Sequence, residues 1–473
     1  MPLTEVPIAP LAWERFADVL APEQLERLAA TVADGRRLFA GRVVWNVNST
    51  ARGGGVAELL TSLIAYVRGA GIDSRWVVIP GDPDFFTVTK RIHNHLHGFA
   101  GDGGALDAEA RAVYERATAR AAEELAHVVR PGDAMLLHDP QTAGLVAPMV
   151  DAGAWVVWRC HVGVDEPNEL ARAAWGFLLP YIERAHAFVF SREAFVWEDV
   201  DRSRVSIIAP SIDAFSPKNA ELSPDTIRAI LHHVGVIDGG TSAPPVFTRA
   251  DGTPGRVDRV ADAVQARPLR ADDRVLVQVS RWDRLKDPLG VMAAFARDVA
   301  APAQLLLAGP STAAVADDPE GAEVLREAIG FRDDLEPDVR ERVHLVSLPM
   351  DDLEENAAIV NALQRRADVI AQKSTAEGFG LTVAEAMWKG RPVIGSRVGG
   401  IQDQLVDGQT GILVDPHDLD GFGRAASELL GDVERAEAMG RAAHERVREH
   451  FLGPRHLEQY LTLFTGVLEG AAT

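Results

Sequence analysis

Short runs of apolar residues recur along the chain and alternate with longer stretches whose apolar positions repeat at helical spacing. The runs are continuously apolar, which is typical of parallel strands buried on both faces by helices. The first series comprises Arg42–Asn48, Arg75–Pro80, Ala134–His138, Ala154–His161, His186–Phe190 and Val205–Ala209. The second series comprises Arg274–Ser280, Gln304–Gly309, Arg342–Leu348, Asp368–Gln372, Pro392–Ser396 and Gly411–Val414. Each series predicts one doubly wound, Rossmann-like α/β domain.

The stretch between the two series, residues 210–273, has the composition expected of a crossing between domains, including the polar segment Thr248–Gly255. We therefore expect a first domain over residues 1–215 and a second over residues 216–454, which opens with the helical pattern Ser223–Val234. The C-terminal helical pattern breaks at Gly453–Pro454, and its last part, about residues 455–473, is expected to pack back on the first domain.

Composition bounds the class of protein. The 473 residues suffice for two or three hydrophobic cores, and the net charge of −21 disfavours binding to the nucleic-acid backbone. No apolar stretch approaches the roughly 18 residues of a membrane span, and the N-terminus lacks the pattern of a secretory signal. The single cysteine, Cys160, excludes an internal disulfide and a cysteine-ligated zinc site. We expect a cytoplasmic protein with neither nucleic acid nor membrane as partner.

Two facing α/β domains would place strand ends and helix N-termini along a cleft, where phosphate-bearing ligands usually bind. The first strand runs into a glycine-rich turn that contains Gly53, Gly54 and Gly55. Glycines at such a turn let backbone N–H groups approach an anion closely. The turn has neither the full dinucleotide fingerprint nor the lysine of a P-loop, and a tight turn without a ligand is the alternative.

The first strand of the second series ends in a loop that carries Arg281 and Lys286. A guanidinium and an ammonium at this spacing can bracket one anion. Asp283 and Asp287 lie in the same loop, so a solvated loop of ion pairs is the alternative.

Glu377 opens a second glycine loop, Gly378-Phe379-Gly380-Leu381, after the strand Asp368–Gln372. Glu385 falls eight residues later, inside the following helix. Two carboxylates that flank loop amides suit a polyol and a phosphate held together, because carboxylates accept paired hydroxyls. The alternative is a capping Glu377 and a surface Glu385, but the apolar neighbours of Glu385 leave little exposed face.

Together these residues resemble the retaining, two-domain GT-B glycosyltransferases that use nucleotide sugars. The family's Glu-x7-Glu pattern corresponds to Glu377 and Glu385, and its diphosphate-binding cations correspond to Arg281 and Lys286. The resemblance implies that Glu385 binds the nucleotide ribose. It also implies that Glu377 and the amides of the Gly378–Leu381 loop bind the donor sugar, with the amides of Gly53–Gly55 near the diphosphate.

The N-terminal half is similar to the trehalose glycosyltransferring synthases, which share their opening segment with retaining trehalose phosphorylases. Four blocks carry this resemblance, namely Trp45–Glu58, Val88–Asn94, His138–Gln141 and Trp158–His161. It implies that the acceptor is bound by Lys90, Asn94, Asp139 and Gln141. It further implies that His161 contacts the donor sugar and is catalytic together with Arg281, Lys286 and Glu377.

The implied activity is retaining transfer of glucose from a nucleoside-diphosphate glucose, such as UDP-glucose or ADP-glucose, to free glucose, giving trehalose reversibly. A trehalose phosphorylase is the nearest alternative, and a non-catalytic sugar-nucleotide binding protein is an alternative of another class. The resemblance requires no cofactor, although Mg²⁺ could accompany the nucleotide, and it favours a homodimer.

Two further patterns could suggest a metal site. Asp82-Pro83-Asp84 looks like a metal-binding acid pair, but the proline and the lack of a third acid nearby favour a turn. His93, His95 and His97 crowd one stretch without an acidic or thiolate partner at a ligand spacing. We therefore expect no protein-bound metal.

Overall fold

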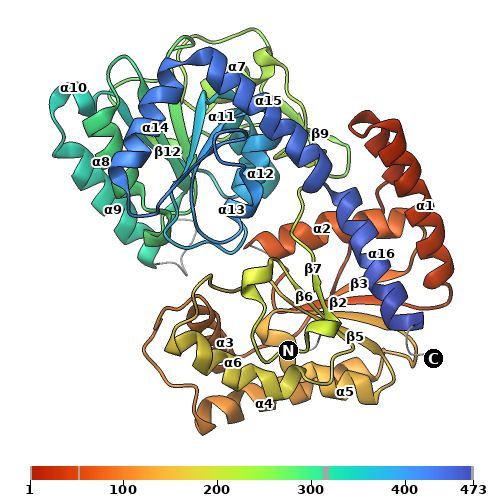
Figure 1. Cartoon of the computed structure of the whole chain (residues 1–473). Coiled ribbons are helices and arrows are strands. Elements are labelled where there is room, and N and C mark those ends of the chain that lie inside the picture. The colour runs from red at the N-terminus through yellow and green to blue at the C-terminus, as the bar shows by residue number, and fades with distance from the viewer. Residues whose placement is uncertain (1–2, 52–53, 313–318, 470–473) are drawn as a thin grey trace. The chain divides into compact units, whose positions relative to one another are not determined.

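The chain forms two compact units, each built on one sheet (Figure 1). The computed structural model describes residues 3–51, 54–312 and 319–469. Unit 1 comprises residues 1–211 and 451–473, and unit 2 comprises residues 212–450. The chain therefore passes between the units at residues 211/212 and 450/451, and the predicted boundaries fall a few residues C-terminal of these crossings.

The sheet of unit 1 has the strand order β1-β3-β2-β4-β5-β6-β7. Its strands are β1 (Thr4–Val6), β2 (Val44–Asn48), β3 (Ser74–Val78), β4 (Ala134–His138), β5 (Trp155–Cys160), β6 (Ala187–Phe190) and β7 (Val205–Ile207). β1 pairs antiparallel with β3, and the other neighbours pair in parallel. β2 to β7 each overlap one predicted apolar run, whereas the edge strand β1 was not predicted.

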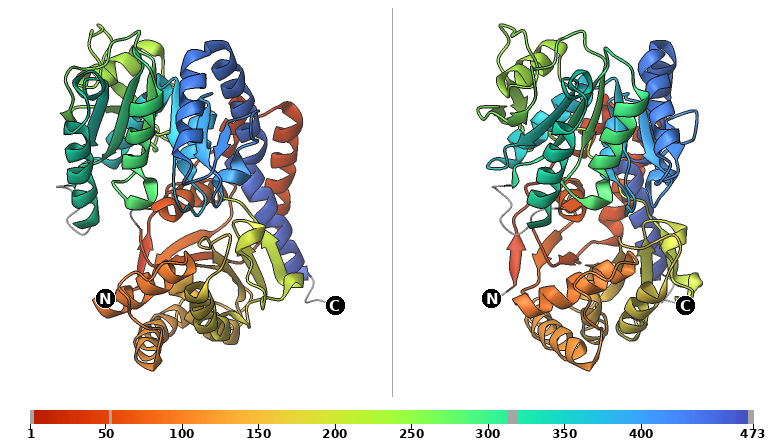
Figure 2. Two further views of the ribbon diagram at one scale, coloured as in Figure 1. Left: turned by 60° about the vertical axis from the view of Figure 1, so that its left-hand side comes forward. Right: turned by 90° about the vertical axis from the view of Figure 1, so that its left-hand side faces the viewer.

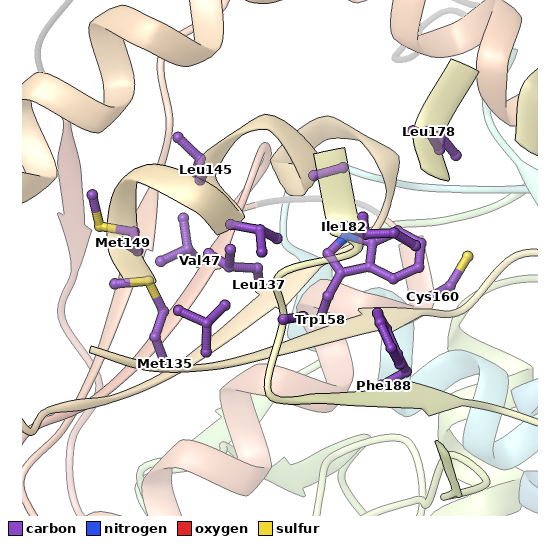
Figure 3. Packing of buried hydrophobic residues seen from close by; sticks show 14 of the residues in the cluster. Val47, Met135, Leu137, Leu145, Met149, Trp158, Cys160, Leu178, Ile182 and Phe188 are labelled. Atoms are coloured by element: carbon purple, nitrogen blue, oxygen red, sulfur yellow. The ribbon is translucent and has the colours of Figure 1, made fainter. Parts of the chain in front are cut away.

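Alternate residues of the strands in unit 1 face two helical layers. One layer comprises α1 (Pro22–Leu38), α2 (Gly54–Gly69) and α16 (Gly453–Glu469). The other comprises α3 (Pro83–Leu96), α4 (Ala108–Ala126), α5 (Val146–Asp151) and α6 (Glu169–Ile182). Trp45 and Val47 face the second layer, in the core that Figure 3 shows around Trp158, whereas Val44 faces the first layer. α16 thus completes unit 1 through Tyr460, although it lies at the far end of the sequence.

Three helices of the second layer begin at capping side chains. Asp82, Asp107 and Asn168 accept hydrogen bonds from the first N–H groups of α3, α4 and α6. Asp82-Pro83-Asp84 is therefore a helix start, with Asp82 as the cap and Pro83 in the first turn. This explains the pattern without a metal, and the prediction of a simple turn is refined to a helix N-terminus.

The sheet of unit 2 has the order β10-β13-β12-β11-β14-β15-β16. Its strands are β10 (Asp262–Val264), β11 (Val275–Val279), β12 (Gln304–Pro310), β13 (Val343–Leu348), β14 (Val369–Gln372), β15 (Val393–Ser396) and β16 (Ile412–Val414). β10 pairs antiparallel with β13, and the other six strands are parallel in the Rossmann order 3-2-1-4-5-6. These six overlap the six predicted runs.

Helices cover both faces of this second sheet as well (Figure 2). The helices of unit 2 are α7 (Pro224–His233), α8 (Pro288–Asp298), α9 (Pro319–Asp333), α10 (Pro337–Arg340), α11 (Leu353–Arg366), α12 (Leu381–Trp388), α13 (Ile401–Gln404), α14 (Leu419–Gly431) and α15 (Val433–His450). α8, α9 and α14 form one core with the strands, and α11 packs on β11 and α7 from the other face. The burial of both faces explains why the strands read as continuous apolar runs.

The interpretation of residues 210–273 as a crossing was wrong for most of that stretch. α7 is the helix predicted at Ser223–Val234, but the stretch also contains β10 and an antiparallel hairpin of β8 (Val246–Thr248) and β9 (Pro254–Arg256). The hairpin is held to the start of α11, because Arg249 pairs with Asp352 and Glu354 at 2.8 Å each. Long-range ion pairs, which a local composition cannot reveal, fix this segment in unit 2.

Each sheet has one point at which the strand order reverses. In unit 1 the reversal lies between β2 and β4, and in unit 2 it lies between β11 and β14. In open α/β sheets, ligands bind outside the carboxyl ends of the strands at this point. The residues that follow these four strands are therefore the ones in which to look for a site.

Within the described residues, no helix combines the length and the apolar character needed to span a bilayer.

Candidate functional site

A lysine and a glutamate meet at the switch point of unit 2. Lys286 ends the short 3-10 helix Arg284–Lys286 after β11, and Glu377 lies in the loop after β14. The Lys286 Nζ donates to Glu377 Oε2 at 2.5 Å, with side chains 15% and 14% exposed. The structure thus brings together two predicted residues that lie 91 positions apart.

The carboxylate of Glu377 is held by its own loop as well. Gln372 Nε2 and Ser374 Oγ each lie 3.3 Å from the same Oε2 atom. The Thr375 N–H also donates to the carbonyl oxygen of Leu285 at 2.8 Å, which joins the two strand-end loops through the backbone. The position of Lys286 relative to Glu377 is therefore fixed by backbone and side-chain contacts together.

The loop Gly378–Leu381 takes a tight path against the start of α13. Gly400 N–H donates to the Gly378 carbonyl at 2.9 Å, and Gln404 Nε2 donates to the Phe379 carbonyl at 2.6 Å. Gly380 has φ +81°, a left-handed conformation that glycine adopts readily, and α12 begins at the next residue. With these carbonyls bound to protein, the N-terminal end of α12 offers N–H groups and a positive dipole end to an anion.

Arg281 and Glu385 occupy different surroundings from the central pair. The Arg281 guanidinium pairs with Asp283 at 2.8 Å and is 65% exposed. This agrees with the alternative interpretation, a solvated loop of ion pairs. Glu385 on α12 is 1% exposed, so the alternative of a surface Glu385 was wrong. Lys218 Nζ lies 3.4 Å from Glu385 Oε1. Sequence reasoning missed Lys218, which lies in the stretch interpreted as a crossing.

In unit 1 an aspartate and a histidine meet at the switch point. Asp139 follows β4 with φ +67°, an uncommon conformation for a non-glycine residue. Its carboxylate accepts the His161 backbone N–H at 2.8 Å and lies 3.1 Å from His161 Nδ1. The side chains are 16% and 9% exposed. Asp139, predicted only as an acceptor ligand, is therefore also the group that orients His161.

This pair is electrically different from the pair in unit 2. Burial raises the pKa of Asp139, but the charge of His161 and the hydrogen bonds from it outweigh burial and lower the pKa to about 2. Burial lowers the pKa of His161, although Asp139 acts in the opposite direction. A neutral His161 then donates its Nδ1 proton to Asp139. Its buried Nε2, which has no hydrogen-bond partner among the described residues, is left as an acceptor.

Further polar groups surround His161. His138, at the end of β4, stacks on His161 with ring centroids 5.5 Å apart and lies 3.4 Å from Asn46 Oδ1. Burial, followed by the charges of His97 and Lys90, lowers the pKa of His93 to about 4, and Asp139 opposes this shift. Sequence reasoning did not assign roles to His138 and Asn46, although both fall within the quoted blocks.

The remaining predicted acceptor residues lie on nearby elements of unit 1. Lys90 is exposed and Asn94 is half-buried on α3, and Gln141 is half-buried in the 3-10 helix Pro140–Leu145. α3 contacts the 3-10 helix Pro140–Leu145, which follows Asp139 directly, so these residues lie on adjacent elements.

The predicted glycine turn is described only in part. Gly53 lies outside the described residues, α2 begins at Gly54, and Gly55 is exposed in the first turn of that helix. For a metal, the described part of the chain shows no group of three or more histidine, cysteine, aspartate or glutamate residues that could hold an ion.

The fold has solved counterparts. A UDP-forming α,α-trehalose-phosphate synthase from Burkholderia vietnamiensis superposes with a TM-score of 0.64 at 15% identity, over 91% of this chain and 98% of that one. Sucrose-phosphate synthase from Thermosynechococcus elongatus gives 0.61 at 20% identity, over 91% and 100%. Residues 352–446 match the family model of glycosyl transferases group 1. The solved counterparts define the fold as GT-B, and the family match makes the chain a glycosyltransferase.

Comparison of sequences narrows the class. Residues 46–197 match the family model "Trehalose synthase, N-terminal domain". Trehalose synthase from Rubrobacter xylanophilus is 37% identical over 91% of this chain and 92% of its own. Trehalose synthase from Thermococcus litoralis is 34% identical over 95% and 96%. A trehalose phosphorylase from Pleurotus pulmonarius is 26% identical over 85% of this chain and 54% of its own. The chain belongs to the trehalose synthase family, which confirms the predicted resemblance.

Proposed function

We propose that this glycosyltransferase transfers glucose from a nucleoside-diphosphate glucose to free glucose, forming trehalose with retention at the donor carbon. The observation that carries the proposal is the Lys286–Glu377 pair at the switch point of unit 2, in a chain that is 34–37% identical to trehalose synthases. An ammonium beside a carboxylate suits a ligand that carries a phosphate next to a hydroxylated sugar.

The donor is assigned to unit 2. Lys286 would neutralise charge on the diphosphate. Glu377 would accept hydrogen bonds from hydroxyl groups of the donor glucose. The N-terminal amides of α12, beginning at Leu381, would face the diphosphate. Glu385 would bind the ribose, displacing Lys218 from its position 3.4 Å away.

The acceptor is assigned to unit 1. His161 presents Nε2 as a hydrogen-bond acceptor because Asp139 holds its Nδ1 side. This Nε2 atom would accept a hydrogen bond from a hydroxyl group of the donor glucose near the reacting carbon. Lys90, Asn94 and Gln141 would orient the acceptor glucose.

The reaction is proposed as a front-face displacement. The bond between donor carbon 1 and the phosphate oxygen breaks, and the anomeric oxygen of the acceptor bonds to the same face of that carbon. The departing phosphate oxygen takes the acceptor proton. Because negative charge grows on the diphosphate, a preorganised cation such as Lys286 is worth on the order of 3 kcal/mol, about a hundredfold in rate.

Trehalose phosphorylase is the second candidate, favoured by the 26% identity to the Pleurotus pulmonarius enzyme. It would use inorganic phosphate where the synthase uses a nucleoside diphosphate. The lower identity to the phosphorylase, 26% against 34–37% for the synthases, favours the synthase.

Product identification decides between the candidates. UDP-, ADP- and GDP-glucose are each incubated with glucose, and the disaccharide is identified. In the reverse direction, trehalose is incubated with UDP, with ADP or with phosphate. Nucleoside-diphosphate glucose as the product supports the proposal, whereas glucose 1-phosphate from phosphate alone supports the phosphorylase. Nucleotide binding without any product would indicate a non-catalytic binding protein.

A further inference from the structure

Lys373 is a buried lysine that the proposed reaction does not use. It follows β14 directly and is 1% exposed. Its Nζ donates to Asp287 Oδ2 and, at 2.9 Å, to the carbonyl oxygen of Pro416. Burying an ammonium costs free energy that an ion pair does not always return, so stability alone is a weak reason for this arrangement.

The partner of Lys373 is the residue that follows Lys286. Asp287 has φ +47° and ψ 52°, a left-handed conformation that is uncommon for a residue other than glycine. Its Oδ1 accepts the Gly290 N–H at 3.0 Å and so caps α8. One carboxylate therefore caps a helix with one oxygen and binds Lys373 with the other.

Two ion pairs thus join the same two strand-end segments. Lys286 pairs with Glu377, and the following residue, Asp287, pairs with Lys373. The left-handed turn at Asp287 sets the direction in which the chain leaves Lys286 for α8. A contact that holds this turn also holds the Lys286 backbone against the Glu377 loop.

We propose that Lys373 is a positioning residue for donor binding, which acts through Asp287 to hold Lys286 where the diphosphate of the donor binds. This inference rests on the proposed function, because it takes Lys286 to be the phosphate-binding cation. It predicts a selective effect. Loss of Lys373 lowers the affinity for the diphosphate and leaves the affinity for the nucleoside unchanged.

Calorimetry with UDP, ADP and GDP and with the matching nucleosides uridine, adenosine and guanosine tests the inference on the full chain. In Lys373→Met we expect the affinity for the nucleoside diphosphate to fall about tenfold, as for a weakened charged hydrogen bond, with nucleoside affinity within about twofold of the starting protein. The double variant Lys373→Met with Asp287→Asn is expected to keep the fold, because asparagine tolerates the left-handed conformation and keeps the helix cap. It should show the same selective loss.

A double-mutant cycle with Lys286→Ala separates positioning from a direct contact. If Lys373 acts through Lys286, adding Lys373→Met to Lys286→Ala weakens diphosphate binding by less than about twofold more. Arg332→Met is the matched control, because Arg332 is a buried cation of α9 that donates to the Val343 carbonyl at 2.8 Å, away from these loops. It should lower the melting temperature and leave the ratio of the two affinities unchanged.

The outcomes separate this inference from the function on which it rests. Unchanged diphosphate affinity in a folded Lys373 variant, equal losses for nucleoside and diphosphate, or a full tenfold effect on top of Lys286→Ala would each overturn the positioning role alone. Failure of the starting protein to bind any of UDP, ADP and GDP, or unchanged diphosphate binding in Lys286→Ala, would overturn the proposed function and the positioning role together.

Discussion

The two units place polar groups at the same point of similar sheets, but the group that lies beside the carboxylate differs between them. In unit 1 the carboxylate of Asp139 is matched to a histidine whose pKa burial lowers. In unit 2 the carboxylate of Glu377 is matched to the ammonium of Lys286 at 2.5 Å. A neutral imidazole beside a carboxylate suits the orientation of hydroxyls, whereas a charged pair can exchange partners with an anionic ligand. The same fold thus supports two kinds of chemistry through the residues at its strand ends.

Acidification should affect unit 1 more strongly than unit 2. Burial lowers the pKa of six histidines in unit 1, namely His93, His95, His138, His161, His186 and His456. In unit 2, among the described residues, burial lowers the pKa of His344 to about 4. The unfolded chain binds these protons near pH 6.5 and the folded chain only at lower pH, so stability falls as the pH decreases from 6.5 toward 4. For His93, whose pKa is about 4, the full shift corresponds to about 3 kcal/mol.

Hydrogen exchange followed peptide by peptide at pH 7 and pH 5 measures this difference. We expect protection, corrected for intrinsic rates, to fall more in the strands of unit 1. His93→Gln should reduce the pH dependence in unit 1, and His344→Gln should reduce it in unit 2. Equal losses of protection in both units would contradict the expected difference.

Lys286→Ala should give the largest loss of activity. It removes the cation of the unit 2 pair, and we expect kcat/KM for glucosyl transfer to fall about a hundredfold. Arg284→Ala is the matched control, because Arg284 lies two residues away and pairs with Glu323 and Glu327 on the surface. It should stay within about twofold of the starting protein. Comparable losses in both variants would mean that the loop, rather than the pair, is responsible.

Asp139→Asn should have a smaller effect, on kcat. Asparagine matches aspartate in size but does not hold the His161 tautomer as a carboxylate does, and we expect kcat to fall about tenfold. Asp133→Asn is the control at the opposite end of β4, where Asp133 accepts hydrogen bonds from Val43 N–H and from Trp45 Nε1. It should lower the melting temperature and leave kcat per folded molecule unchanged. The reverse pattern would remove His161 orientation from the proposed mechanism.

Arg281→Ala should have the smallest effect of the four. Its guanidinium is 65% exposed and already paired with Asp283, so solvent screens it more than Lys286. We expect KM for the donor to rise about threefold, with kcat nearly unchanged. The difference between Arg281→Ala and the starting protein should shrink when KM is measured at 0.5 M instead of about 0.05 M salt. A hundredfold loss would mean that Arg281 moves onto the diphosphate when the donor binds.

Much of the fold could be predicted because burial on both faces leaves a continuous apolar signal. The twelve parallel strands overlap the predicted runs, and α7 lies within the predicted helical pattern Ser223–Val234. The edge strands β1 and β10 and the hairpin strands β8 and β9 have exposed positions among their three residues, so they lack the continuous apolar run of the buried strands. Their positions depend on pairing with distant strands or on ion pairs such as Arg249–Asp352.

The sequence by itself determined the class of fold and the strand ends at which polar residues gather, because local apolar patterns and turn residues carry that information. It also pointed to Lys286, Glu377 and His161 as candidates. Only the tertiary structure decided which groups touch: Glu377 with Lys286, His161 with Asp139, and Lys373 with Asp287. These pairs join loops that the sheet order brings together across many residues of chain, and no local pattern encodes that order.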